Sequence, residues 1–439
     1  MDKTHSKNQY LRRGSILMLT TFALGFIMAY AFNVALSNML GPVDYGDYKV
    51  AEAYIALGSL VVMMGGSRAT ASFLSKQIND GSGEGVWEYV RFYIVLSTVL
   101  SLVLLFLIYA VHHYHLSLFP EKEYHPLIIA SLALPLVAMA ALFGGILQLA
   151  KHLNLSFLPW RIGYPGLRLL LCGGFFLIFG SLDDFEAVAL TLIAAFLIAV
   201  FCAYHTLRLG LMPLKRDKNF VKPIEWLKIS TPMMMIIALQ TFMRQVDIYM
   251  IEFQLDEMSV GHYAAAMTSV SVINSVQSAI YGLIIPLIIP TLESGKAAII
   301  QMNRKAFFIL LKTVIPTFCL LGLFGTQLLS VFGNDVENTY ICLMTLAAGF
   351  CIYGINSASV LWLQYSGQER WLMYNLMITL GINATLNYIL IPRMGIEGAA
   401  IATSLSLIIS TIIVVVKLKM HLGFFPWTSP EEKGEVESA

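Results

Sequence analysis

The middle of the chain holds one basic stretch, LRLGLMPLKRDKNFVKPIEW, at residues 207–226. Long apolar runs lie on both sides of it, and a run of about 20 apolar residues is enough to span a bilayer. Working outward from this stretch, six such runs precede it and six follow it. The stretch therefore indicates a polar linker between two sets of six helices.

The composition agrees with a membrane protein. Hydrophobic residues make up 57% of the 439-residue chain and charged residues 13%, and the mean hydropathy is +0.72. A soluble domain of this composition would expose large apolar patches to water and aggregate. A polytopic membrane protein instead exposes them to lipid. The five cysteines form no C-x-x-C pair, so neither a disulfide framework nor a zinc site is predicted.

We predict an all-α polytopic membrane protein with about twelve transmembrane helices in two pseudo-symmetric six-helix lobes. The helices are expected at residues 14–40, 50–74, 88–111, 126–150, 157–180, 186–207, 226–251, 260–291, 306–332, 339–364, 371–392 and 396–416. The predicted organisation is a cytoplasmic tail (1–13), a first lobe (14–207), a cytoplasmic linker (208–225), a second lobe (226–418) and a cytoplasmic tail (419–439).

The Lys and Arg residues give an orientation. With both termini in the cytoplasm, the outer loops hold only Lys49, Lys122 and Arg393, and 21 of the 28 basic residues lie on the inner side. Such an excess of basic residues is typical of the cytoplasmic side. The sequence thus predicts a multi-pass protein of the bacterial cytoplasmic membrane with both termini inside.

Weak internal repeats relate the two halves. A G-x-Y-x-x-A pattern occurs in YGDYKVA (45–51) and again in VGHYAAA (260–266), 215 residues later. Two further weak matches follow in the same order at nearly the same offset. A fixed offset indicates duplication. Six helices per half would give both copies one orientation, with a substrate path expected between the lobes.

One predicted helix, 226–251, carries charge. Gln240, Arg244 and Asp247 follow the spacing i, i+4, i+7 and therefore share a face. Charge inside a membrane is costly and is normally turned towards protein or a water-filled cavity. Two interpretations stay open: Arg244 lines a substrate cavity, or an Arg244–Asp247 pair locks two helices together.

A second charged helix is predicted at 157–180. Arg161, Tyr164 and Arg168 share one face, and four Pro and Gly residues interrupt the helix. Broken helices often line transport sites. Arg168 is expected to face protein or a cavity. Arg161 either does the same or extends to the inner interface.

Several other polar residues are candidates for the predicted cavity. Arg68 and Lys312 lie near the inner ends of their helices, where they either reach the interface or contact substrate. Asn33 and Asn274 belong to polar stripes on helices 14–40 and 260–291, which fit packing or cavity lining equally well. The stripe on helix 371–392 is expected to form interhelical hydrogen bonds and comprises Asn375, Thr379, Asn383 and Asn387.

The intramembrane charges are mainly basic, with only Asp247 and Glu52 as acids. A cationic interior suits an anionic substrate such as a phosphate or carboxylate. No phosphate-binding loop or H-E-x-x-H motif occurs, so no catalytic residue or metal site is predicted. The run HHYH (112–115), with His125 nearby, is interpreted as an exposed histidine-rich turn.

Four stretches together resemble the polysaccharide (Wzx-type) flippases of the multidrug/oligosaccharidyl-lipid/polysaccharide exporter superfamily. They are LSNMLGPVDYGDYKVAEAY, GGSRATASFL, VDIYMIEFQLDEMSVGHYAAAMTSV and LNYILIPRMGIEGAAIATSLSLI. The resemblance implies two six-helix lobes around a central cavity and alternating access. It also implies a cargo, an undecaprenyl-pyrophosphate-linked oligosaccharide, which moves between leaflets for surface polysaccharide synthesis. Implied partners are this cargo, membrane lipids and glycan polymerase machinery, but no nucleic acid.

Two alternative functions are also compatible with the sequence. An ion-coupled small-molecule exporter of the same superfamily would favour acids in its cavity, and this chain lacks an acid in its first helix. A membrane glycan polymerase or ligase would need a larger outer loop. No cofactor is expected, and coupling to protons, sodium ions or the membrane potential is left open.

Overall fold

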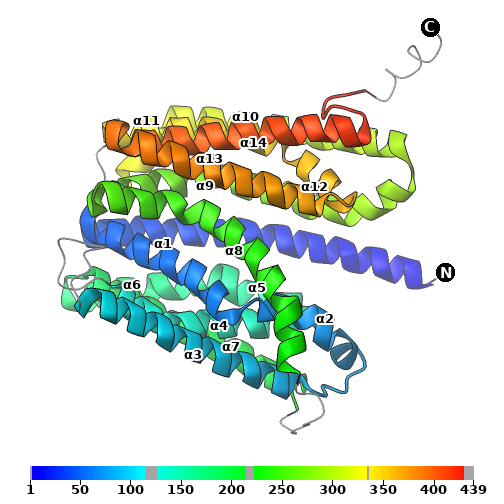
Figure 1. The fold of residues 1–439 in the computed structure, drawn as a ribbon, viewed down its shortest axis with the longest axis horizontal. Coiled ribbons are helices and arrows are strands. Elements are labelled where there is room, and N and C mark those ends of the chain that lie inside the picture. Colours follow the sequence, from blue (N-terminus) through cyan, green and yellow to red (C-terminus); the bar gives the residue numbers. More distant parts are fainter. Residues whose placement is uncertain (1, 114–125, 214–221, 334–335, 430–439) are drawn as a thin grey trace. The chain divides into compact units, whose positions relative to one another are not determined.

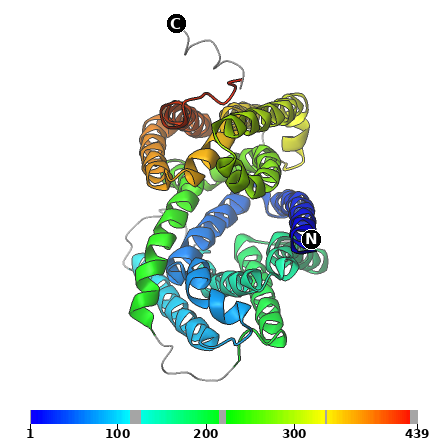
Figure 2. The same cartoon turned by 90° about the vertical axis from the view of Figure 1, so that its right-hand side faces the viewer.

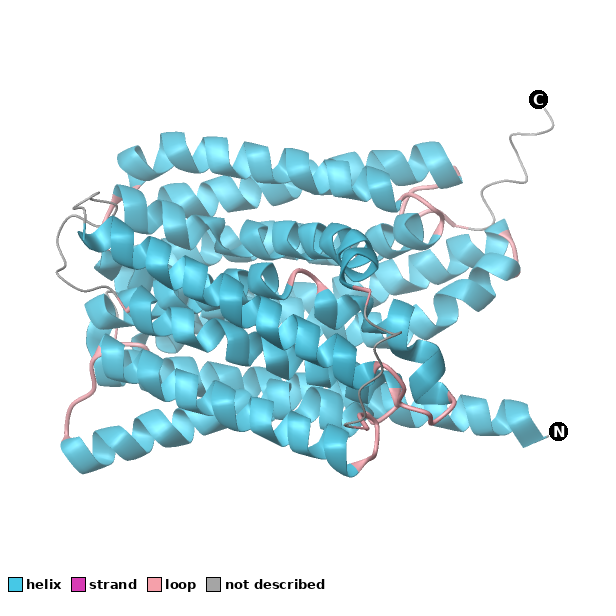
Figure 3. Ribbon diagram, turned by 60° about the horizontal axis from the view of Figure 1, so that its bottom comes forward, coloured by secondary structure: helices cyan, strands magenta, loops and turns pink. Residues whose placement is uncertain are grey.

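The computed structural model describes residues 2–113, 126–213, 222–333 and 336–429. Within these ranges every regular element is a helix (Figure 3). Residues 214–221 of the predicted linker, residues 430–439 of the predicted tail, and His115 and His125 lie outside the described residues. The helices are α1 (Asp2–Met63), α2 (Gly66–Asn79), α3 (Val86–His113), α4 (Leu127–Leu149), α5 (Leu153–Leu158), the π-helical turn η1 (Pro159–Gly163), α6 (Tyr164–Phe179), α7 (Asp184–Arg208), α8 (Pro223–Gln254), α9 (Glu257–Glu293), α10 (Lys296–Ser330), α11 (Val336–Asn356), α12 (Ala358–Tyr365), α13 (Glu369–Met394) and α14 (Ile396–Leu422).

The fold is that of a multi-pass membrane protein. Among the described residues, nine helical stretches are long and apolar enough to cross a membrane. One of these stretches, Ala23–Met63, overlaps two of the predicted spans, and α8 and α9 cover two more that are not among the nine. The predicted helical segments therefore all have a helical counterpart.

Helix α1 is two helices joined at a sharp reversal. Gly41 has φ 77° and ψ 175°, outside the helical region, and Pro42 begins the second segment. In a straight helix Asn33 and Lys49 would lie about 24 Å apart, yet Lys49 Nζ donates a hydrogen bond to Asn33 Oδ1 over 3.2 Å. The chain must therefore turn back at Gly41 (Figure 1).

This reversal corrects two expectations. The second segment begins at Pro42 rather than at 50, because Pro is well suited to the first helical position. Lys49 consequently lies inside a helix and not in an outer loop. The segment also ends early, at Met63, where Met64 and Gly65 have φ values of 47° and 76° and break the predicted helix 50–74 before α2 begins.

The helices cluster into two units, Ile27–Gly261 and, in the other, Met1–Phe26 with His262–Ala439. The two lobes predicted at 14–207 and 226–418 remain a prediction. Within Ile27–Gly261, α4 is the central helix and packs against α2, α3, α5 and α7. Its buried side chains include Leu134, Leu142 and Ile146, none of which has any exposed surface.

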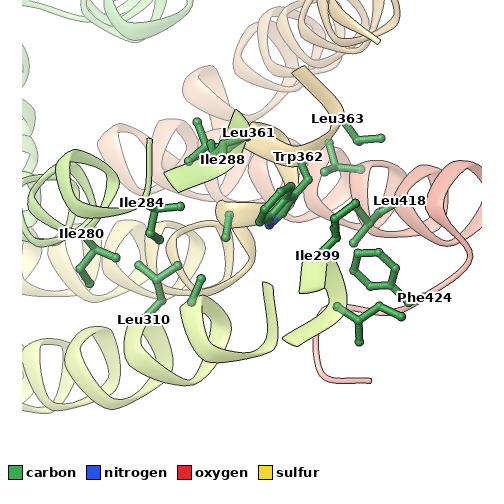
Figure 4. Packing of buried hydrophobic residues seen from close by; sticks show 14 residues of the cluster. Ile280, Ile284, Ile288, Ile299, Leu310, Leu361, Trp362, Leu363, Leu418 and Phe424 are labelled. Atoms are coloured by element: carbon green, nitrogen blue, oxygen red, sulfur yellow. The ribbon is translucent and has the colours of Figure 1, made fainter. Parts of the chain in front are cut away.

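In the other unit, α14 packs against both α11 and α13, and α13 (orange) lies beside α14 (dark red) in Figure 2. Trp362 on the short helix α12 is fully buried. It packs in an apolar cluster with residues of α9, α10 and α14, including Ile288, Leu310 and Leu418 (Figure 4). This cluster forms the core of the unit.

The polar stripe of α13 packs as predicted. Asn375 Nδ2 donates to Ser410 Oγ on α14 over 2.8 Å, and Asn383 Nδ2 donates to Thr403 Oγ1 over 3.0 Å. All of these groups are buried. The stripe therefore joins α13 to α14 by interhelical hydrogen bonds.

Two repeat-related glycines meet at a helix crossing within Ile27–Gly261. A Cβ added at Gly46 would collide with the Glu257 carbonyl, and one added at Gly261 would collide with the Pro42 carbonyl. Pro42 and Glu257 are themselves 215 residues apart, as are Gly46 and Gly261. A reciprocal contact of this kind is what segments related by a two-fold axis make. It supports the duplication inferred from the repeated motif.

This crossing predicts a stability effect. Gly46→Ala should destabilise the protein by about 1–3 kcal/mol, because its methyl group would overpack a backbone contact, and Gly261→Ala should do so to a similar extent. Thermal unfolding of the purified protein in detergent measures the effect. Gly174→Ala on α6 is the matched control, since a Cβ there meets nothing within 4 Å. Equal stability of Gly46→Ala and Gly174→Ala would contradict the crossing.

Candidate functional site

A break in the helix places two aromatic rings on one face. Between α5 and α6, residues 159–163 form a π-helical turn, closed by the Tyr164 N–H donating to the Pro159 carbonyl. Pro lacks an N–H and disturbs the normal helical ladder, which favours such local widening. Trp160 and Tyr164 then stack with ring centroids 4.6 Å apart and planes 6° from parallel. The broken helix predicted at 157–180 is confirmed.

Arg168 lies deeper along the same helix and is buried, with 6% of its surface exposed. Its Nη2 donates to Glu52 Oε1 over 2.6 Å. The guanidinium also lies over three aromatic rings, with its carbon 4.0 Å from the Phe32 centroid, 4.9 Å from Tyr164 and 5.7 Å from Tyr48. A buried guanidinium requires such a partner and such rings because its desolvation is costly. The prediction that Arg168 faces protein is confirmed.

Glu52 joins Arg168 to a second cation. Its Oε2 accepts a hydrogen bond from Lys49 Nζ, one turn earlier on the same helix. Lys49 also donates to Asn33 Oδ1, which accepts a second hydrogen bond from Tyr45 over 3.0 Å. Asn33 is thus a candidate that the structure connects to Arg168, through Lys49 and Glu52. We call Arg168, Glu52 and Lys49 the ion triad.

A cavity of about 320 Å³ lies beside the ion triad, entirely within Ile27–Gly261. The three members of the triad supply its charged lining, so the lining carries a net charge of +1. The rest of the lining comes from six helical elements and comprises Ala53, Ile55, Ala56, Val137, Trp160, Tyr164, Thr191, Gln245 and Ile248. The cavity is therefore apolar and aromatic on most sides and cationic on one.

The candidates on α8 lie next to this cavity in sequence. Arg244 precedes the lining residue Gln245, is exposed, and donates to Thr241 Oγ1 over 3.4 Å. Arg161 follows the lining residue Trp160 and is also exposed. Each of these two arginines is thus the chain neighbour of a residue that lines the cavity.

The other two candidates on α8 differ in exposure. Asp247 is buried, with 2% of its surface exposed, whereas Gln240 is exposed. Their shared helical face therefore runs from an exposed to a buried environment. The pairing of Asp247 with Arg244 stays a prediction.

The remaining candidates lie apart from the ion triad. Arg68 on α2 is exposed, although it belongs to the same unit. Lys312 on α10 is exposed and Asn274 on α9 is partly buried, and both belong to the other unit. Their roles remain predictions.

Sequence reasoning missed Lys49, Trp160 and Thr191 as site residues. Lys49 was excluded because the helix was expected to begin one residue after it. The Lys-x-x-Glu spacing of Lys49 and Glu52, one helical turn, was the signal that could have found it. Thr191 bonds to Tyr48 over 2.9 Å, a contact between residues 143 positions apart that no spacing reveals.

One acidic group lies beside the glycine crossing. Carboxylate oxygens of Asp47, Glu252 and Glu257 lie within 4.8 Å of one another. Such oxygens suit a hard cation, but Asp47 and Glu252 make other contacts as well. Proximity of acids alone does not identify a metal site.

Comparison with known proteins gives a family and a fold. A family model described as "Polysaccharide biosynthesis protein" matches residues 11–291. A solved multidrug resistance MATE family transporter of the MOP superfamily, in an inward-facing conformation, has a TM-score of 0.71 at 15% identity, covering 92% of this chain and 94% of its own. The lipid II flippase MurJ in an inward closed conformation has a TM-score of 0.71 at 17% identity, covering 91% and 87%. No curated protein matches the chain in a sequence comparison.

A third similar structure is a MOP superfamily transporter from Pyrococcus furiosus, whose binding pocket is described as having reversed polarity. Its TM-score is 0.57 at 14% identity, covering 94% of this chain and 95% of its own. At these identities the three structures establish the fold alone. The predicted membrane-transporter fold is confirmed.

The ion triad predicts an order of stabilities. Glu52→Gln should destabilise the protein by about 3 kcal/mol, because it leaves two buried cations without their carboxylate. Arg168→Gln should cost less, since Glu52 then keeps Lys49. Denaturant unfolding of the purified protein in detergent would rank the variants.

Glu225→Gln is the matched control, because Lys222 and Glu225 form an ion pair at the same i, i+3 spacing with side chains 56% and 60% exposed. Its loss should cost less than about 1 kcal/mol. A Glu52→Gln variant no less stable than Glu225→Gln would refute the structural role of the triad.

Proposed function

The chain belongs to the polysaccharide biosynthesis protein family, and from this we propose that it is a flippase for a lipid-linked oligosaccharide. The proposed cargo is an undecaprenyl-pyrophosphate-linked glycan destined for O-antigen, capsule or exopolysaccharide. It would cross the bacterial cytoplasmic membrane by alternating access, with both termini of the chain in the cytoplasm. The match of the family model to residues 11–291, together with the net positive lining of the cavity, is the observation that carries this proposal.

Arg161 and Arg244, the chain neighbours of two cavity-lining residues, would together suit a pyrophosphate. Each guanidinium offers a planar fork of donors that can hold phosphate oxygens at two points. Bringing two of them together is unfavourable unless an anion neutralises both, and a pyrophosphate carries its charges on two adjacent phosphates. The site therefore favours a cargo with a diphosphate group over a neutral or cationic one.

Asp247 would give Arg244 a different partner when no cargo is bound. It follows Arg244 by three residues on α8 and would hold the guanidinium while cargo is absent. Cargo would then compete with Asp247 for Arg244, and this differential interaction would favour one conformation over another. An intramembrane acid beside an arginine also offers a route to proton coupling; sodium ions and the membrane potential are further driving forces.

An ion-coupled exporter of small molecules is the second candidate, because the fold matches that of multidrug transporters. A cavity for cationic drugs would be lined mainly by acids, whereas the cavity in Ile27–Gly261 carries a net positive charge. A glycan polymerase or ligase is a weaker candidate, because the family and fold are those of transporters. Membrane lipids and glycan polymerase machinery are the proposed partners.

Reconstitution tests the function directly. Liposomes containing the purified protein and a fluorescent undecaprenyl-pyrophosphate-linked saccharide would be treated with a membrane-impermeant quencher. Translocation brings labelled lipid from the inner leaflet to the quencher. Quenching should therefore exceed the half-way level that liposomes with the labelled lipid but without protein reach. Quenching that stops at the level of empty liposomes would reject the proposal, and uptake of a cationic dye instead would favour the exporter.

Arg244 is predicted to be essential for export. Arg244→Ala should abolish translocation while leaving the amount of protein in the membrane near normal, because the exposed guanidinium contacts cargo more than it holds helices together. Arg244→Lys should recover only part of the activity, since a point charge lacks the planar fork. The liposome assay and immunodetection of membrane protein measure both effects.

Lys228→Ala is the matched control, an exposed cation nearer the start of the same helix. It should translocate normally. If Arg244→Ala also translocates normally, or if that variant disappears from the membrane, Arg244 has a structural role instead.

A further inference from the structure

We propose that the cavity beside the ion triad binds a single carboxylated sugar residue, of the hexuronate class, in the glycan that the protein moves. This inference rests on the proposed function and names the chemistry of part of its cargo. It also assigns a role to Trp160, Thr191, Gln245 and Lys49 as a saccharide subsite within Ile27–Gly261.

The charge of the lining favours an anion. Arg168 and Lys49 share one carboxylate, Glu52, so one positive charge in the lining is not neutralised by any other lining residue. Lys49 and Arg168 are both largely buried, with 12% and 7% of their side-chain surface exposed. Excess charge away from water is strongly unfavourable. A ligand with one carboxylate would bring the lining to neutrality.

The ion triad also offers a hydrogen-bond donor to a ligand. Among the residues that the structure describes, Arg168 Nε is a buried atom without a hydrogen-bond acceptor, although Nη2 of the same guanidinium is bonded to Glu52. A buried donor without an acceptor costs free energy that a ligand oxygen can recover. A carboxylate is the acceptor that forms the strongest bond to a guanidinium. The ion triad therefore provides both a positive charge and a hydrogen-bond donor for a ligand carboxylate.

The rest of the lining suits a sugar ring. Trp160 stacks on Tyr164 through one face of its ring, and the C–H face of a pyranose can cover its other face. Thr191 and Gln245 add groups that can bond to hydroxyls. Trp160 is 36% exposed, so protein does not cover its whole ring. A volume of about 320 Å³ is at the small end for ligand pockets and fits one ring rather than a chain.

The position of the cavity agrees with the rest of the proposed cargo. Arg161 and Arg244 are the chain neighbours of two lining residues, Trp160 and Gln245. A pyrophosphate held by these two arginines would leave a sugar residue close to the cavity. The two sites would then bind adjacent parts of one molecule, namely its diphosphate and a nearby acidic sugar.

Calorimetric titration of the purified full-length protein in detergent tests the subsite. Three probes would be compared at constant ionic strength: D-glucuronate, D-glucose and inorganic sulfate. We expect glucuronate to bind at least about tenfold more tightly than the other two, because only it combines a ring with a carboxylate. A tenfold difference corresponds to about 1.4 kcal/mol, the range expected for one charged hydrogen bond.

Variants locate the binding. Trp160→Leu and Gln245→Leu should each weaken glucuronate binding several-fold without disturbing the ion triad, and Arg168→Lys should weaken it about tenfold. Trp427→Leu is the matched control, an exposed tryptophan in the other unit that should leave binding unchanged. Trp160→Leu keeps the test valid if the Arg168 variant fails to fold.

Several results would overturn the proposal. If glucose binds as tightly as glucuronate, the cavity does not recognise the carboxylate. If sulfate binds as tightly as glucuronate, the cavity does not recognise the sugar ring. Absence of heat with glucuronate, or wild-type affinity in Trp160→Leu, would remove the subsite. If liposomes still translocate a neutral lipid-linked saccharide in any of these cases, the subsite fails while the flippase function stands. If no lipid-linked saccharide is translocated, the function itself fails.

Discussion

The cost of keeping the Arg168 guanidinium away from water governs the structure of Ile27–Gly261. A single charge at this depth would be strongly destabilising, and two contributions offset that cost: the Glu52 carboxylate and the faces of Phe32 and Tyr164. These groups come from both segments of α1 and from α6. Positioning them together constrains where those helices can lie, so one ionic contact fixes the arrangement around the cavity.

Straight helices could not assemble this site. Asn33 and Lys49 meet only because the chain reverses at Gly41, whose positive φ a side chain would resist. Trp160 lies in a π-helical turn, and Tyr164 directly follows that turn. Local departures from helical geometry inside a membrane are tolerated where neighbouring groups satisfy the backbone and where the departure lines a cavity. Here the π-helical turn contains the lining residue Trp160 and directly precedes the lining residue Tyr164.

The bilayer explains why so much of the fold could be predicted and why the site could not. Its thickness imposes a length on every span, so the apolar runs predict the helices, and the cost of buried charge predicts that Arg168 faces protein. The α13 stripe was equally predictable, because asparagines at i+4 steps need hydrogen-bond partners inside a bundle. The partner of Arg168 was not predictable, because Glu52 is 116 residues away and no periodicity connects them. Lys49 was missed because the prediction placed it in a loop, and only the backbone at Gly41 and Pro42 shows otherwise.

The two repeated motifs pack reciprocally, but the chemistry lies in one of them. Tyr48 in the first motif corresponds to Tyr263 in the second, and Gly46 to Gly261, where each glycine meets the backbone of the opposite motif. At the same offset, Lys49 corresponds to Ala264 and Glu52 to Met267. The close approach of the two backbones needs the glycines in both motifs, so both retain them. The ion triad does not depend on that symmetry, because its third member comes from α6. A cationic cavity can therefore form beside the first motif without a charged counterpart at the second, and the repeat becomes chemically asymmetric while its packing stays reciprocal.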